Sequence, residues 1–263
     1  MAQARGVLKP VSKRSLAAEV FAQLRDHILE GTLEAGEALP AERTLAEQLQ
    51  VNRGAVREGL KRLEQAGLVA IQQGGATRVL DYKRTAGLEI LASMMVRGDG
   101  TVDTAIARGV LELRTQLAPI VAKLCTERAK EDVHTRLTAI VREMQASRGD
   151  LPTLQRLALD FWAAMVDGTE NVALELAFNS LASTYSGVLD QFTQILATEV
   201  GAVDDFEALV EAVIGQQPKR AASKATQIVS RGAQAIEGVL AALDTVQRGM
   251  QQGMQDAKGG AKP

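Results

Sequence analysis

The chain has 263 residues, of which 46% are hydrophobic and 24% charged, a composition that is ordinary for a globular protein and suggests two domains. Aromatic residues make up only 3% of the chain, so its core must consist mainly of Leu, Val, Ile and Ala, which favours helices. The net charge is −2; a single cysteine excludes a disulfide framework, two histidines exclude a multi-histidine metal site, and no apolar run is long enough to span a membrane.

The N-terminus and the charge distribution narrow the class of protein further. The first residues are partly basic but no apolar segment follows them, so the sequence predicts a cytoplasmic protein without a secretory signal. Residues 1–85 carry 13 basic side chains against 10 acidic ones, whereas the remainder carries 17 against 22. A basic head on an acidic body indicates that the head is the part that meets an anionic partner.

Three helices are predicted in the N-terminal part of the chain. The first covers 16–30, and the second is short and opens at Pro40. The third covers 53–66 and follows Asn52, a favourable N-cap residue. The apolar face of the first helix consists of Leu16, Val20, Phe21, Leu24 and Ile28.

The third predicted helix has two distinct faces. Val56, Leu60 and Leu63 follow the spacing of a buried stripe. Arg53 and Arg57 lie four residues apart on another face, from which they could reach guanine edges or phosphates. A solvated helix face without any function would show the same spacing, so the surrounding motif has to decide.

A hairpin is predicted after the third helix. Two short β-prone runs, 69–71 and 77–79, flank a tip that is rich in glycine. Helix, helix, short turn, helix and hairpin is the order of a winged helix-turn-helix, in which the second helix of the pair reads the major groove of DNA. The place of the two arginines on this reader helix favours a contact with DNA over a plain solvated face.

After residue 79 the sequence changes to long amphipathic helices, which together predict a helical bundle. A linker helix is expected over 85–96, and the next helix should be kinked by Pro119. Residues 250–263 have no periodicity and predict a disordered tail. The apolar row of the helix that contains Pro119 consists of Ile106, Val110, Leu113, Leu117, Ile120 and Leu124. Further helices are expected at 132–146, 153–167, 172–198, 204–215 and 220–248.

A set of short motifs runs through the predicted helix-turn-helix: Leu39-Pro40-Ala41-Glu42-Arg43, Leu45-Ala46, Val51-Asn52-Arg53, Val56-Arg57-Glu58, Leu60, Leu63 and Gly67-Leu68. Over residues 15–80 this set resembles the signature of the GntR family of bacterial transcription regulators. The resemblance implies a homodimer that binds a palindromic operator in double-stranded DNA and senses a small-molecule effector. The DNA contacts that the family pattern assigns to this chain are Arg43, Asn52, Arg53, Gly54, Arg57, Gln73 and Gly74.

Phe161 and the run Gly168-Thr169-Glu170-Asn171 lie in the predicted C-terminal bundle. They resemble part of the FCD sensor domain, the mark of the FadR subfamily. Many FCD domains bind a divalent metal through one Asp and three His. The positions that correspond to these ligands hold residues that cannot bind a metal, namely Ala158, Trp162, Phe206 and Ile228. The resemblance therefore implies a sensor domain with neither a metal nor a cofactor.

Three runs in the wing and linker, 70–74, 77–79 and 85–91, are similar to those of the fatty-acid regulators in the FadR subfamily. This similarity implies a long-chain fatty acyl-CoA as effector and control of fatty-acid metabolism genes. The positions that it assigns to the effector site are Tyr82, Arg114, Tyr185 and Phe192, with Arg114 offering charge to the CoA phosphates. Tyr185 and Phe192 equally fit a plain core stripe, and the alternative effector is a small carboxylate or another metabolite bound without metal.

These inferences divide the chain into an N-terminal arm (1–14), a winged helix-turn-helix DNA-binding domain (15–80), a linker helix (81–100), an all-helical ligand-sensing domain (101–249) and a tail (250–263). The expected fold is mainly α, with a small β-hairpin, and no membrane partner is expected. An enzyme is disfavoured because Cys125 has no adjacent histidine to form a nucleophile–base pair. A nucleoid-type structural protein is disfavoured because the second domain has the size of a sensor.

Overall fold

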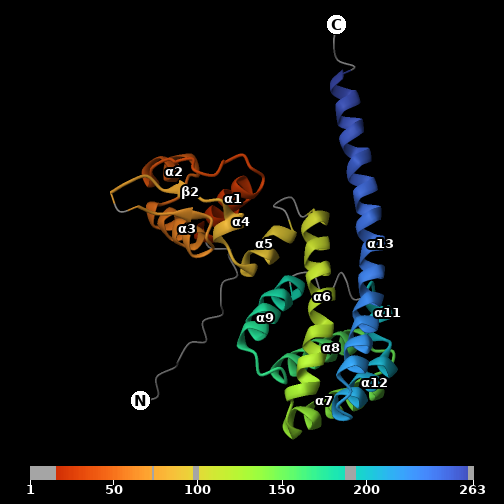
Figure 1. Cartoon of the computed structure of the whole chain (residues 1–263). Helices are drawn as coiled ribbons and strands as arrows, with labels where there is room; N and C mark the ends of the chain where they lie inside the picture. Colours follow the sequence, from red (N-terminus) through yellow and green to blue (C-terminus); the bar gives the residue numbers. More distant parts are fainter. Residues whose placement is uncertain (1–15, 73, 97–100, 187–193, 260–263) are drawn as a thin grey trace, which may run out of the picture. The chain divides into compact units, whose positions relative to one another are not determined.

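The computed structural model describes residues 16–72, 74–96, 101–186 and 194–259 of the chain (Figure 1). The chain divides into two compact units, residues 1–90 and 91–263. Both units consist mainly of helices, and the sheet that the described residues form is a two-stranded hairpin, so the predicted mainly α fold is confirmed. Among the described residues, no helix combines the length and the apolar character needed to span a bilayer.

The N-terminal unit has the element order of a winged helix-turn-helix. Strand β1 (Val69–Ala70) pairs antiparallel with β2 (Arg78–Val79), and Val69 lies opposite Val79. Pro40 lies outside the second helix rather than at its first position, because the extended Ala41 is the N-cap. The helices are α1 (Leu16–Leu29), α2 (Glu42–Gln48), α3 (Arg53–Gln65), α4 (Tyr82–Thr85) and the 3-10 helix η1 (Leu88–Ile90).

A close crossing of α1 and α3 organises the core of the N-terminal unit. A Cβ on Gly59 of α3 would lie 2.7 Å from Cγ1 of Val20 and 3.2 Å from the backbone oxygen of Ala17, so the glycine permits this approach. Leu16, predicted on the apolar face, is the first residue of α1 and is 49% exposed, whereas the neighbouring Ala17 is buried. The buried residues around the crossing include Val20, Leu24, Ile28, Leu45, Val56, Leu60, Leu63, Leu68 and Val79.

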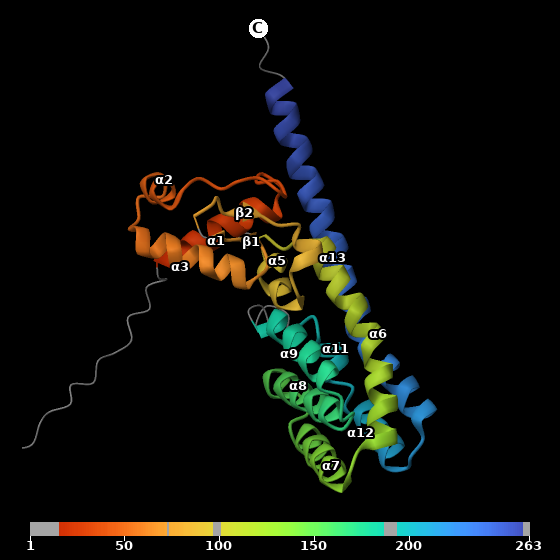
Figure 2. The ribbon, with the colours of Figure 1, turned by 60° about the vertical axis from the view of Figure 1, so that its left-hand side comes forward.

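The C-terminal unit is a bundle in which two long helices, α6 (Thr104–Arg128) and α13 (Pro218–Gly259), lie side by side (Figures 1 and 2). Helix α8 is central to the apolar core, to which it contributes Leu157, Phe161 and Met165. The remaining helices are α5 (Leu91–Met95), α7 (Glu131–Ala146), α8 (Leu151–Asp167), α9 (Val172–Ser186), α11 (Ala197–Val200) and α12 (Val203–Ile214).

Most of the apolar row that the sequence predicts on α6 is buried or half-buried: Val110 belongs to a buried cluster with Met95 and Leu181, and Ile106, Leu113 and Leu117 pack against that cluster. Ile120, a member of that row, is 49% exposed, and the helix passes through Pro119 as a single element. Burial raises the pKa of the Cys125 thiol to about 12, so the thiol stays protonated at neutral pH. A second buried face includes four small residues, Ala107, Ala118, Ala122 and Cys125. Small side chains let a neighbouring helix approach closely, so α6 packs through this second face as well as through its apolar row.

Three other expectations about helices are wrong. The linker over 85–96 is divided among α4, η1 and α5, because Ala86 and Gly87 interrupt it and glycine weakens a helix. The helix predicted over 172–198 is not continuous, since residues 194–196 form a turn before α11. Helix α13 continues to Gly259, where the sequence predicts a disordered tail, because the Gln, Met, Ala and Lys residues there are good helix formers.

Candidate nucleic-acid interface and ligand cavity

The N-terminus of α3 is capped and sterically open. Asn52 accepts a hydrogen bond from the backbone N–H of Ala55 over 2.8 Å, which confirms its predicted N-cap role. A Cβ on Gly54 would lie 3.1 Å from Oδ1 of Asn52, so the glycine leaves this cap undisturbed. Because the unpaired N–H groups at a helix N-terminus attract anions, this end of α3 is suited to a phosphate contact.

Two exposed arginines lie four residues apart on α3. Arg53 forms no ion pair with any residue that the structure describes, whereas Nη2 of Arg57 lies 3.2 Å from Oε2 of Glu42 on α2. The hydrogen bond to this carboxylate raises the pKa of the Arg57 guanidinium above its usual value. Arg43 is also exposed, and its Nε lies 3.8 Å from Oε1 of Glu47. Helices α2 and α3 thus present three guanidinium groups to solvent, two of them beside glutamates.

Hydrogen bonds connect the hairpin region to the loop before α2 and to α3. Nη1 of Arg78 donates to a backbone oxygen in the loop before α2 over 3.0 Å, and the N–H of Ile71 donates to Oε1 of Glu64 on α3 over 3.0 Å. Gly74, at the exposed tip, has a φ of +73°, a left-handed conformation that favours glycine. Gln73, the other predicted contact at the tip, lies outside the described residues. The assignments of DNA contacts to individual residues stay predictions.

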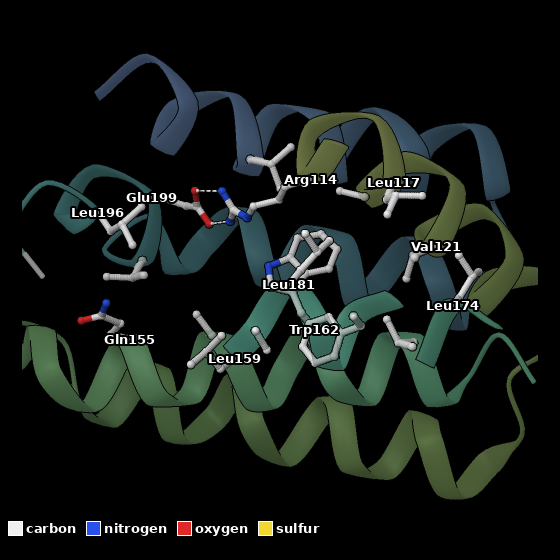
Figure 3. A pocket seen from close by; sticks show the side chains of 17 residues that line it. Arg114, Leu117, Val121, Gln155, Leu159, Trp162, Leu174, Leu181, Leu196 and Glu199 are labelled. Carbon is white, nitrogen blue, oxygen red and sulfur yellow. Dashed lines mark hydrogen bonds and ion pairs between the residues drawn. The ribbon is translucent and has the colours of Figure 1, made fainter. Parts of the chain in front are cut away.

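A second candidate site is a cavity inside the C-terminal unit (Figure 3). It comprises about 880 Å³ of empty space, part of which is open to solvent at its mouth. Its walls are apolar apart from Arg114, Gln155 and Glu199 and the indole nitrogen of Trp162. Figure 3 shows Arg114, Gln155 and Glu199 toward one end, with Val121 toward the other, so the cavity has a polar end and an apolar end.

A buried ion pair occupies the polar end of the cavity. Nη1 of Arg114 donates to Oε2 of Glu199 over 3.0 Å, and Nη2 of the same guanidinium contacts Oε1 (Figure 3). The Arg114 side chain is 19% exposed and that of Glu199 only 3%. A Cβ on Gly232 of α13 would overlap Oε2 of Glu199 and lie 2.9 Å from its Cδ, so the glycine provides the space for this carboxylate. Paired in this way, the two groups add no net charge to the cavity.

Trp162 of α8 contributes an unpaired hydrogen-bond donor to the cavity. Its ring packs edge-on against Phe161, with 5.8 Å between the ring centroids. The residue is 8% exposed, and its Nε1 is buried without an acceptor among the described residues. In Figure 3 the indole nitrogen is turned toward the end that holds Arg114 and Glu199. An indole N–H can donate a hydrogen bond but cannot accept one, so this atom is suited to an acceptor on a ligand.

The four positions that correspond to metal ligands in related sensor domains do not fit a divalent ion. Ala158 and Trp162 line the cavity, whereas Phe206 and Ile228 are fully buried in the core. Phe206 packs edge-on against Phe161 at a centroid distance of 5.0 Å. The described part of the chain holds no group of three or more His, Cys, Asp or Glu side chains that could bind a metal. Apolar side chains with no lone pair to donate cannot replace such ligands.

Of the four residues predicted to contact the effector, Arg114 is the one that the described structure places in the cavity wall. Tyr82 begins α4 in the N-terminal unit and is not part of the lining. The side chain of Tyr185 and the whole of Phe192 lie outside the described residues. The role of Arg114 therefore stays a prediction, and the structure adds a carboxylate partner that the prediction does not include.

Sequence reasoning missed Glu199 and the donor of Trp162. A glutamate between Leu196 and Val200 on an apolar stretch is a weak signal, because exposed helix faces also carry glutamates. Trp162 is the chain's only tryptophan. Because it stands where related sensor domains have a metal-binding histidine, the sequence predicts that its side chain fills the space of the absent metal site. The structure shows instead that this side chain lines open space.

Comparison with protein families assigns both units to known groups. Residues 16–79 match the family described as bacterial regulatory proteins, gntR family, and residues 109–231 match the FCD domain. The family and the relatives found are transcription regulators and not enzymes.

Two of the similar proteins match most of the chain, and a third matches less than half of it. The HTH-type transcriptional regulator Mce2R of Mycobacterium tuberculosis is 35% identical over 233 residues, which cover 89% of this chain and 96% of that protein. A fatty acid metabolism regulator protein of Vibrio cholerae is 33% identical over 121 residues, or 46% of this chain and 43% of that protein. The solved structure of Lar from Listeria monocytogenes aligns with a TM-score of 0.53 at 16% identity, covering 86% of this chain and 98% of that one, which indicates a shared fold.

Proposed function

Since the chain belongs to the GntR family of bacterial transcription regulators and carries an FCD domain, we propose that it binds a palindromic operator as a homodimer and that a long-chain fatty acyl-CoA modulates this binding. The genes under its control are then those of fatty-acid metabolism. The observation that carries the proposal is the cavity of the C-terminal unit, which is apolar along most of its wall and polar at one end.

The N-terminal unit supports the part of the proposal that concerns DNA. Arg53 and Arg57 project from the first two turns of α3, next to a capped helix N-terminus that is suited to phosphate. The wing is tied to α3 by the bond between Ile71 and Glu64. A single reader helix covers one half-site, and helix-turn-helix proteins reach two half-sites by dimerisation, which supports a palindromic operator.

The apolar cavity supports a fatty acyl effector. Burial contributes about 0.8 kcal/mol per methylene, so a sixteen-carbon chain could supply on the order of 10 kcal/mol before the cost of ordering it. The Vibrio relative is named a fatty acid metabolism regulator, which supports control of fatty-acid metabolism genes, although the match covers less than half of either chain. For such a ligand to regulate, it must bind the DNA-free and DNA-bound proteins with different affinity. The segment from α4 to α5, which connects the two units along the chain, is the natural place for that coupling.

A small carboxylate bound without metal is the second candidate effector. The guanidinium of Arg114 favours it, because such a group binds a carboxylate through two parallel hydrogen bonds. The carboxylate of Glu199 opposes it, because it already occupies this guanidinium. The ion pair therefore makes an uncharged, apolar-tailed group the better occupant of the cavity.

Operator binding in the presence of candidate effectors tests the proposal. In a gel shift with DNA from the region upstream of the protein's own gene, palmitoyl-CoA or oleoyl-CoA at micromolar concentration should weaken the complex. Free CoA and a short-chain acyl-CoA should have little effect, because neither buries a long chain. Release of the DNA by short carboxylates and not by acyl-CoA would identify the second candidate instead.

A further inference from the structure

We propose that the polar end of the cavity binds a neutral hydrogen-bond acceptor, the carbonyl oxygen of a thioester or ester at the head of an apolar chain, and that Nε1–H of Trp162 is its donor. This inference rests on the proposed function, because it names the group of the effector that the cavity recognises. It excludes a free carboxylate from the same position.

The donor is the first observation that supports this inference. Nε1 of Trp162 is buried in the wall of the cavity without an acceptor among the described residues. Buried donors are rarely left unpaired in folded proteins, because the lost hydrogen bonds to water are not replaced. An acceptor on the ligand would satisfy this atom, and Figure 3 shows it on the side of the ring that faces the polar end.

The charge balance is the second observation. Arg114 is the cation in the wall of the cavity, and Glu199 neutralises it through two contacts. Glu199 is 3% exposed and its carboxylate lies in the space that Gly232 leaves open, so the pair is a packed part of the bundle. A ligand carboxylate at this end would meet the negative charge of Glu199 in a site with little water, which is costly. A carbonyl oxygen accepts a hydrogen bond without bringing a charge.

Two ligands that differ by one oxygen atom test the donor. Palmitoyl-CoA has the thioester carbonyl, and S-hexadecyl-CoA has the same chain length and head group with a methylene in its place. The affinity of the full-length protein and of Trp162→Phe for both is measured by isothermal titration calorimetry. We expect Trp162→Phe to weaken palmitoyl-CoA binding about three- to tenfold, the worth of one hydrogen bond. Binding of S-hexadecyl-CoA should change less than about twofold, which also shows that the cavity of the variant is intact.

A spectroscopic measurement on the unmodified protein gives the same answer without a variant. Because Trp162 is the chain's only tryptophan, the protein has one indole N–H signal in a ¹H–¹⁵N spectrum. This proton should move downfield when palmitoyl-CoA is bound, relative to the complex with S-hexadecyl-CoA. Equal shifts in the two complexes, or equal losses of affinity for both ligands in Trp162→Phe, would overturn the inference and leave the acyl-CoA proposal standing.

The exclusion of carboxylates is tested with ligands that lack CoA. The unmodified protein should bind methyl dodecanoate more tightly than dodecanoate, whereas Glu199→Gln, which leaves Arg114 without its counter-charge, should gain about ten- to hundredfold in affinity for dodecanoate. Tighter binding of dodecanoate by the unmodified protein would overturn the inference. Binding of the ester together with no binding of either CoA ligand would support the inference and refute acyl-CoA as effector.

Discussion

Each unit contains an ion pair between an arginine and a glutamate, and the two pairs differ in their exposure to solvent. In the N-terminal unit Arg57 pairs with Glu42, and the two side chains are 62% and 38% exposed. In the C-terminal unit Arg114 pairs with Glu199 at 19% and 3%. An exposed pair contributes little to stability and can exchange partners, whereas a buried pair cannot lose one member without leaving an uncompensated charge. Exposure therefore decides whether an arginine is available to a ligand.

This difference agrees with the ligands proposed for the two units. DNA brings many phosphates, each of which can replace an exposed glutamate as the partner of an arginine. The cavity offers its ligand apolar walls and, in Trp162, an uncharged donor without an acceptor among the described residues, and its arginine is paired with an internal carboxylate. An arginine in a pocket is thus no sufficient reason to expect an anionic ligand.

Breaking the buried pair should have the largest effect. Arg114→Ala leaves Glu199 buried without a counter-charge, so the C-terminal unit should lose about 3–5 kcal/mol of unfolding free energy. Urea denaturation followed by circular dichroism measures this loss. The matched control is Arg108→Ala on the same helix, whose pairs with Glu237 and Asp244 are more exposed. An equal loss in the two variants would show that burial is not what distinguishes the pairs.

Filling the space that Gly232 leaves for the Glu199 carboxylate should have the next largest effect on stability. Gly232→Ala places a Cβ where the carboxylate lies and should destabilise the C-terminal unit by about 1–3 kcal/mol. Gly238→Ala is the matched control on the same helix, because a Cβ there has no neighbour within 4 Å. That control should be neutral or slightly stabilising, since alanine is a better helix former than glycine. Similar melting curves for both variants would contradict the assigned role of Gly232.

Removing an exposed arginine should affect DNA binding and leave folding unchanged. Arg53→Ala should reduce specific binding by about 1–3 kcal/mol per half-site, with Arg57→Ala acting in the same direction. An arginine that reads a base also loses discrimination between operators, whereas one that contacts phosphate mainly lowers the salt dependence. Fluorescence anisotropy at several salt concentrations separates the two. Unchanged affinity in both variants would contradict the placement of α3 in the groove.

Neutralising the partner of Arg57 should have a smaller effect of opposite sign. Glu42→Gln removes a negative charge beside the guanidinium of Arg57, which is predicted to contact DNA, so operator affinity should rise, by less than about tenfold. The melting temperature should stay within error, because both side chains are exposed. Lower affinity in this variant would mean that Glu42 positions Arg57 for the DNA, and the pair would then resemble the buried one.

Removing metal ions should have the smallest effect, because the positions that bind a metal in related domains hold no metal ligand in this chain. With Ala158, Trp162 and Phe206 in place of ligands, EDTA should leave the melting temperature unchanged, since no metal stabilises the native state. Elemental analysis of the purified protein is the independent check. One equivalent of zinc, nickel or manganese per chain would contradict the correspondence of these positions.

Much of the N-terminal unit could be predicted from the sequence because its signals are local. Asn52 caps α3 by accepting a hydrogen bond from Ala55, only three residues further along the chain. The apolar stripe of α3 likewise spans only a few helical turns. The glycine at the hairpin tip adopts the conformation that only glycine adopts easily. Local hydrogen bonds and helix periodicity require no knowledge of the rest of the chain, and the family motifs occupy the same short stretch.

The features of the cavity could not be predicted in this way. Arg114 and Glu199 are 85 positions apart, and Gly232 comes from a third helix, so their meeting depends on how α6, α11 and α13 pack. The same packing buries a second, small-residue face of α6 that the apolar row does not predict, and it leaves Ile120 of that row exposed. The sequence by itself determined the three helices of the helix-turn-helix, the DNA-binding motif and the family, because these follow from residues close together in the chain. Only the tertiary structure decided which charges are buried and paired and which donor faces the cavity, because burial is a property of the assembled bundle.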